Sequence, residues 1–71
     1  MSKLLIGDLV WIPANTVIKY LDGTLYTMGR TKQPTTGVVF GRQSESQCIE
    51  HVHILRFEER ISVKATDVRK L

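Results

Sequence analysis

The feature that most constrains the fold of this chain is the alternation of apolar and polar residues with a period of two. Arg60–Lys64 shows it most clearly, since Ile61 and Val63 fall on one side of an extended chain and Ser62 and Lys64 on the other. No segment repeats its apolar residues with the helical period. For a chain of 71 residues, this pattern predicts one small all-β domain.

Turn-forming residues divide the chain into short extended runs. Pro13 ends the first run, because proline cannot donate to a β-ladder. Gly37 and Gly41 indicate a bend or bulge in a later run. Glu58-Glu59 is expected to turn the chain, and Thr66-Asp67 can start a single helical or 3₁₀ turn. The expected strands are Leu9–Ile12, Thr16–Leu21, Thr24–Met28, Gly37–Arg42, Cys48–Phe57 and Arg60–Lys64.

Asp22-Gly23 lies between two β-rich runs and predicts a hairpin. A two-residue type I′ turn needs positive φ at both central positions, which Asp and Gly tolerate. In that register Tyr20 faces Leu25 and Lys19 faces Tyr26. Both faces of the hairpin then carry apolar residues, with Val17, Leu21 and Met28 on one face and Ile18, Tyr20 and Leu25 on the other.

The core is predicted from the parity that residues share in consecutive strands. Trp11 is also expected in the core rather than at a binding surface. The remaining core positions are Val10, Ile12, Val39, Val52, Ile54, Ile61, Val63 and Val68.

The strand and turn signals follow one another in a characteristic order. The chain opens with Gly7–Ile12, passes through a long excursion to Gly37–Val39, and ends in Ile61–Val68. This order resembles that of SH3-like barrels, above all the small ones encoded by tailed bacteriophages and mobile elements. The resemblance implies one SH3-like domain over residues 1–71, an antiparallel barrel of five to six strands with a hairpin-bearing long first loop. The Asp22-Gly23 hairpin is a departure, because many such barrels have a shorter or irregular first loop.

Charge and cysteine content limit the environment in which the chain works. The net charge of +3 is compatible with a polyanionic partner but does not require one. Cys48 is the single cysteine and favours a reducing compartment. The short apolar run before Gly7 is no signal peptide, and no run approaches the length of a membrane span. We therefore expect no membrane association, and a location in the host cytoplasm or in a virion.

The chain shows no pattern of catalytic or cofactor-binding residues. The serines lack a nucleophile-elbow setting, and there is no phosphate-binding glycine motif. His51 and His53 share one face of the predicted strand, whereas Cys48 and Glu50 point to the other face. Two histidines without a third ligand are a weak indication of a metal site. We expect no enzyme activity, no cofactor and no metal. The histidine pair could still form a pH-sensitive contact across a subunit boundary.

Two surfaces are candidates for binding. The hairpin and the longest run carry more apolar residues than one small barrel can cover, so we expect them to contact a partner. This apolar set is Ile18, Tyr20, Leu25, Tyr26, Leu55 and Phe57. A basic set could instead contact phosphates beside the aromatic residues, and it comprises Arg30, Lys32 and Arg42.

These surfaces lead to two hypotheses about function. The first is a non-enzymatic accessory or structural interaction protein of phage type, which forms a homo-oligomer and docks on a host or virion protein. The alternative is a small nucleic-acid-binding SH3-like module that uses the basic loop patch. Salt dependence separates them, since phosphate contacts weaken steeply as salt rises and apolar docking does not.

Overall fold

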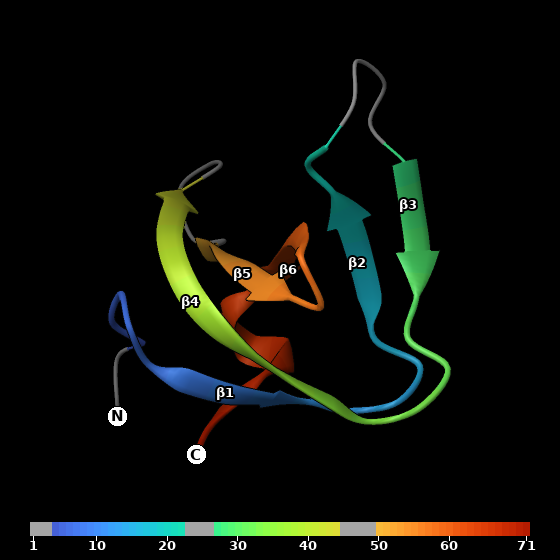
Figure 1. Cartoon of the computed structure of the whole chain (residues 1–71), viewed down its shortest axis with the longest axis horizontal. Coiled ribbons are helices and arrows are strands. Elements are labelled where there is room, and N and C mark those ends of the chain that lie inside the picture. The colour runs from blue at the N-terminus through green and yellow to red at the C-terminus, as the bar shows by residue number, and fades with distance from the viewer. Residues whose placement is uncertain (1–3, 23–26, 45–49) are drawn as a thin grey trace.

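In a computed structural model of the chain, residues 4–22, 27–44 and 50–71 are described. Within these residues, seven strands and one 3₁₀ turn (η1) form an all-β fold (Figure 1). The elements are β1 (Leu9–Ile12), β2 (Val17–Tyr20), β3 (Thr27–Arg30), β4 (Thr35–Ser44), β5 (Glu50–Arg56), β6 (Glu59–Lys64), η1 (Ala65–Asp67) and β7 (Arg69–Lys70). The all-β prediction and the predicted 3₁₀ turn are confirmed. The strand β7 was not predicted.

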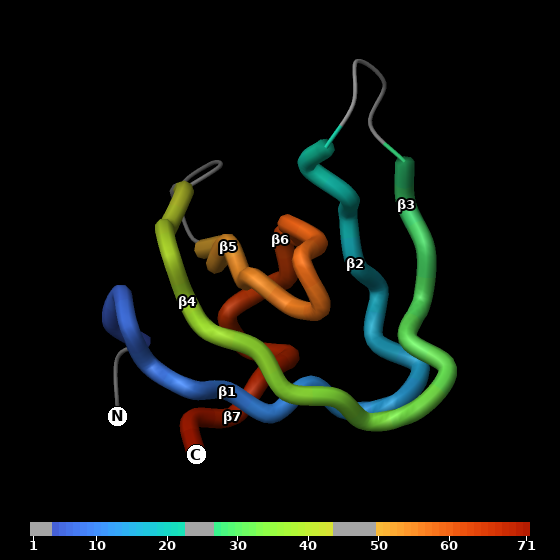
Figure 2. The backbone as a smooth tube through the Cα atoms, in the orientation of Figure 1, coloured from blue at the N-terminus to red at the C-terminus, as the bar shows by residue number. Residues whose placement is uncertain are grey.

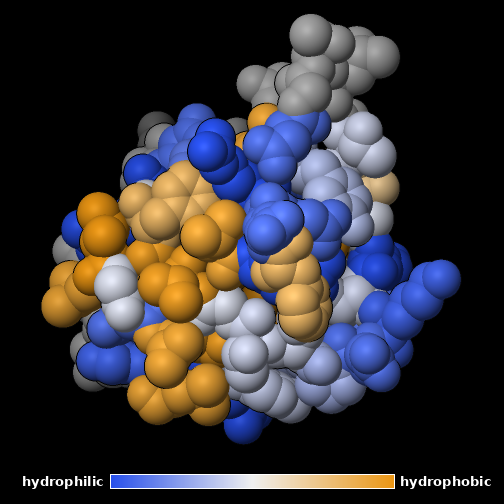
Figure 3. All heavy atoms as spheres, in the orientation of Figure 1, coloured by the Kyte–Doolittle hydropathy of each residue, from blue (hydrophilic) through white to orange (hydrophobic). Residues whose placement is uncertain are grey.

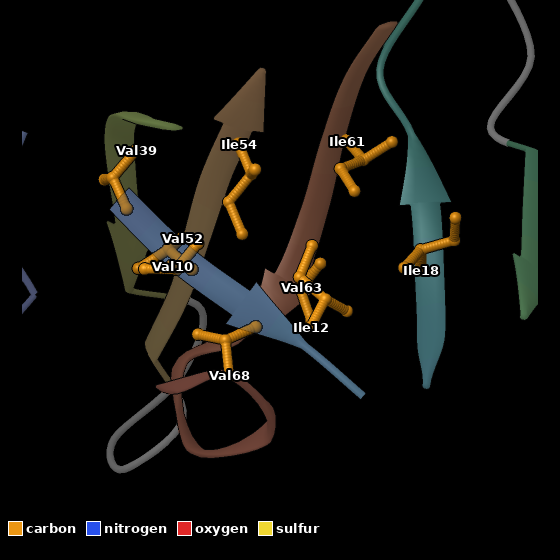
Figure 4. Packing of buried hydrophobic residues seen from close by; sticks show 9 residues of the cluster. All are labelled: Val10, Ile12, Ile18, Val39, Val52, Ile54, Ile61, Val63 and Val68. Atoms are coloured by element: carbon orange, nitrogen blue, oxygen red, sulfur yellow. The ribbon is translucent and has the colours of Figure 1, made fainter. Parts of the chain in front are cut away.

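All the strands belong to one antiparallel sheet in the order β3-β2-β6-β5-β4-β1-β7. Among the described residues, β3 and β7 each pair on one side only, so the sheet is open rather than closed by hydrogen bonds. The sheet nevertheless curls on itself, and β1, which pairs with β4, lies across β5 and β6 (Figure 4). The curl creates an inner face and an outer face.

A long bent ribbon produces much of this curl. The ladder of β1 with β4 ends at the pair Ile12↔Thr35, and the ladder of β2 with β3 resumes in the same register at Val17↔Arg30. Figure 2 shows the two connecting segments, from β1 to β2 and from β3 to β4, turning together between the ladders. At the bend, the hydroxyls of the buried Thr16 and Thr31 both donate to the carbonyl of Pro13, each over 2.7 Å. The ribbon therefore changes direction without leaving these hydroxyls unpaired.

The predicted two-residue turn at Asp22-Gly23 is wrong. Tyr20 faces Thr27 and Lys19 faces Met28, two residues away from the predicted register. The pairing is set from the other end of the hairpin, where β2 and β3 continue the ladder of β1 and β4. Because the shift is two residues, the described side chains of β2 and β3 keep their predicted faces.

The predicted aliphatic core is confirmed, with one addition. Figure 4 shows these side chains on the inner face of the curled sheet, and the described core comprises Val10, Ile12, Ile18, Val39, Val52, Ile54, Ile61, Val63 and Val68. Ile18 is only 1% exposed, so its assignment to a partner surface is wrong. Trp11 is only half-buried and lies outside the core cluster, because it alternates with Val10 and Ile12 and faces outward.

Two glycines shape β4 as it curves. A Cβ at Gly37 would overlap Cγ2 of Ile54 and lie 3.0 Å from the carbonyl oxygen of Leu55, so β4 and β5 approach closely there. The register with β5 then shifts between Val39 and Gly41, which leaves Phe40 as an extra residue. The bend and the bulge predicted from these glycines are confirmed.

Candidate functional site

An apolar strip crosses the outer face of three neighbouring strands. Leu9 of β1 lies opposite Val38 of β4, and Val38 lies opposite Leu55 of β5. Phe40 lies beside them at the bulge. We call Leu9, Val38, Phe40 and Leu55 the outer apolar strip; their exposed fractions are 55%, 38%, 39% and 45%. Figure 3 shows hydrophobic atoms gathered over β4 and the start of β1. The predicted exposure of Leu55 is confirmed.

The turn between β5 and β6 carries the most exposed large apolar side chain in the described part of the chain. Phe57 is 80% exposed. Phe57 and Glu58 have φ of 47° and 64°, so both occupy the left-handed region expected of a type I′ turn. The turn is centred one residue before the predicted Glu58-Glu59, because Arg56 pairs with Glu59. The predicted exposure of Phe57 is confirmed.

A pocket of about 480 Å³ lies beside the β2–β3 hairpin, and we call it the hairpin pocket. Its apolar wall comes from the hairpin, while β6 and η1 supply polar groups. Ser62 belongs to this pocket and is only 7% exposed, although its parity places it on the outer face. Its lining residues include Val17, Lys19, Leu21, Met28, Lys64 and Asp67.

Sequence reasoning missed this pocket, because it depends on the pairing of β2 with β6. Lys19 lies opposite Ser62 in that pairing, although the two residues are far apart in sequence. The available signal was the apolar face of the hairpin that carries Val17, Leu21 and Met28, which had no partner in the chain.

The two histidines lie on the outer face of β5, where His51 lines the hairpin pocket and His53 lies beside the strip. His53 contacts Phe40 with ring centroids 5.7 Å apart, and its Nε2 lies 3.3 Å from Oε1 of Gln43. Burial lowers the pKa of His53 below its ordinary value, and the positive charge of His51 lowers it further. No group of three or more His, Cys, Asp or Glu that could hold a metal occurs in the part of the chain that the structure describes, and Cys48 lies outside it.

The other predicted apolar site residues have different outcomes. Tyr20 is half-buried and its ring covers Gly29, where a Cβ would lie 3.4 Å from Cε2 of the ring. Tyr20 therefore stabilises the hairpin by packing across its strands. Leu25 and Tyr26 lie outside the described residues.

The structure does not gather the three predicted cations into one patch. Arg30 donates to Oδ1 of Asn15 over 3.4 Å at the edge strand β3, and Lys32 follows it in the connection to β4. Arg42 lies towards the opposite end of β4 (Figure 1). There its Nη1 donates to the carbonyl of Leu4 over 3.3 Å and lies 3.9 Å from Oε1 of Glu50.

Comparison with known proteins identifies no relative of this chain. No family model, curated protein or solved structure matches it. In the described part of the chain, no helix has the length and apolar character needed to span a bilayer.

Proposed function

We propose that this protein is a non-enzymatic interaction protein that self-assembles and docks on a protein partner. The outer apolar strip is the observation that carries this proposal. Leu9, Val38 and Leu55 lie opposite one another on adjacent strands, and the bulge residue Phe40 adds to the same exposed apolar surface. Contiguous exposed apolar surface on a small domain favours association with another protein.

The strand arrangement supports an SH3-like barrel as the scaffold. β1 pairs with both β4 and β7, the strands β4, β5 and β6 form a meander, and β2 and β3 lie within the first long connection. The chain ends with a 3₁₀ turn that contains Asp67 and is followed by Val68, as in the barrels it resembles. By the same resemblance, we propose an accessory or structural role of phage type, in the host cell or the virion.

Self-association is favoured because the strip is exposed and apolar. A two-fold contact would bury the same strip on both copies. The resulting contact would also shield the edge of His53 that faces Phe40.

Sedimentation equilibrium at micromolar concentration tests this proposal. The wild-type chain should sediment above its monomer mass of 8.1 kDa, and Leu9→Ser with Leu55→Ser should lower the observed mass while leaving the circular dichroism spectrum unchanged. Lys32→Ser, an exposed change outside the strip, is the control and should behave as wild type. A wild-type monomer at all concentrations would contradict self-assembly, and an unchanged mass for the double variant would contradict the role of the strip.

A further inference from the structure

The β5–β6 turn presents an aromatic side chain from a strained backbone. Positive φ is uncommon for residues other than glycine, and it is a genuine outlier for a bulky side chain such as that of Phe57. Asn-Gly would form the same turn without this strain. With 80% of its surface exposed, Phe57 gains little from packing within its own chain. Packing within the chain therefore gives little reason for an aromatic residue at this position.

The turn also holds the ring of Phe57 in place. The guanidinium of Arg56 lies 5.9 Å from the ring centroid, within the range of a cation–π contact. The Arg56 side chain is only 12% exposed, and its Nη2 lies 3.4 Å from Oε1 of Glu59. An arginine that is largely covered and ion-paired moves little, so it restricts the ring in contact with it. Such preorganisation lowers the entropic cost of docking the ring into a pocket.

The hairpin pocket complements this turn in shape, polarity and charge. Its volume of about 480 Å³ can admit an aromatic side chain, and Val17, Leu21 and Met28 supply apolar contacts. Among the described lining residues, Lys19 and Lys64 outnumber the one carboxylate, Asp67. The turn carries the exposed Glu58 directly after Phe57. An apolar knob with an adjacent negative charge thus matches an apolar pocket with an excess of positive charge.

We propose that the β5–β6 turn of one copy docks in the hairpin pocket of a second copy. Phe57 enters between Val17 and Met28, and Glu58 faces Lys64. This contact rests on the proposed self-assembly and is separate from the outer apolar strip.

The contact must join different surfaces of the two copies. The turn adjoins the first residue of β6, Glu59, while Lys64 in the pocket is the last residue of that strand. Leu21, at the near end of the pocket, bonds to Arg60 beside the turn, but Val17 and Lys64 lie at the far end. A copy therefore cannot place its own Phe57 between its own Val17 and Met28 beside Lys64. Docking is head-to-tail, and repetition yields a ring if the rotation closes and a filament if it does not.

Complementation between two variants tests the proposal. Phe57→Gly removes the knob and also relieves the positive φ, so it should fold. Lys64→Glu reverses an exposed charge of the pocket. Each variant alone should associate at least about tenfold more weakly than wild type by sedimentation, as expected for the loss of an anchor residue. An equimolar mixture should form a heavier species than either variant alone, because one intact turn can meet one intact pocket.

A charge exchange and a control complete the experiment. Adding Glu58→Lys to Lys64→Glu should restore association, whereas Lys32→Glu, a reversal at an exposed lysine outside the pocket, should leave it unchanged. If the wild type self-associates but Phe57→Gly and Lys64→Glu have no effect, or if their mixture gains no mass, head-to-tail docking is wrong and self-assembly stands. A wild-type monomer would overturn both proposals.

Discussion

At the scale of single residues, Gly37 determines how closely two central strands can approach. A side chain at this position would meet Ile54 and the backbone of Leu55. Neither can move aside easily, because Ile54 is fully buried and Leu55 contributes its carbonyl. The absence of a Cβ is therefore required by the packing of β4 on β5.

Gly37→Ala should lower the free energy of unfolding by about 1–3 kcal/mol, the usual cost of overpacking a core. Urea denaturation followed by tryptophan fluorescence measures this. Gly41→Ala is the matched control, because a Cβ there would lie 3.4 Å from Nδ1 of His53, an ordinary contact distance. Equal losses for the two variants would show that close approach at Gly37 is not the cause.

His53 should make stability depend on pH. Its pKa is lowered below 6.5 by burial and then by His51, so the folded chain binds fewer protons than the unfolded chain between the lowered pKa and 6.5. Stability should therefore be greatest above about pH 6.5 and should fall as the pH falls through this window. Thermal melting over this range should show the loss for the wild type and a smaller loss for His53→Gln. An identical pH profile for the two would assign the effect to other groups.

At the scale of elements, local patterns predicted the strands better than their pairing. Alternation identified the strand that became β6 because it depends only on neighbouring residues. The prediction of the hairpin register was wrong because contacts outside the hairpin determine that register. These contacts are the Thr16–Thr31 bend and the pairing of Tyr20 with Ile61. The features of the candidate site also differ in whether local sequence patterns could predict them. Parity predicted the exposure of Leu55, whereas the hairpin pocket requires strands from distant parts of the chain.

The bend of the ribbon gives a prediction at this scale. The hydroxyl of Thr31 donates to the carbonyl of Pro13 and accepts from the amide of Thr16 over 2.9 Å, in a buried setting. Thr31→Val keeps the shape and removes both bonds, and it should cost about 1–3 kcal/mol of stability because the Thr16 amide loses its side-chain acceptor.

Urea denaturation measures this loss, with Thr36→Val as control, because Thr36 is exposed on β4. If the two variants were equally stable, the hydroxyl contacts at the bend would contribute nothing.

At the scale of the whole molecule, the charges are distributed rather than focused. Arg42 is near a carboxylate of Glu50 and is separated from Arg30 and Lys32 by most of β4. A polyanion needs several cations along one path to release many counterions. The net charge alone therefore gives a poor guide to the partner.

We expect no mobility shift of a single-stranded nucleic acid by this protein, even at low salt. Electrophoresis over a salt series checks this. Should a complex form, Arg30→Ala with Lys32→Ala should flatten its salt dependence no more than Arg69→Ala with Lys70→Ala, a pair of exposed cations on β7 of which Lys70 lies 3.7 Å from Oδ2 of Asp8. A steep salt slope lost only with the first pair would instead support the nucleic-acid hypothesis.

The continuous register of the bent ribbon also bears on the order of folding. The residue pairs of the ribbon run in one register from Tyr20↔Thr27 to Leu9↔Val38. Each pair can form beside one that already exists, so each further pair costs little additional loop-closure entropy. The ribbon can thus form early, but a two-stranded ribbon is only marginally stable alone. Until β5 and β6 are synthesised and supply Ile54 and Ile61, the inner side chains Val10, Ile12 and Ile18 face water. We expect the risk of aggregation during chain synthesis to be highest in this interval.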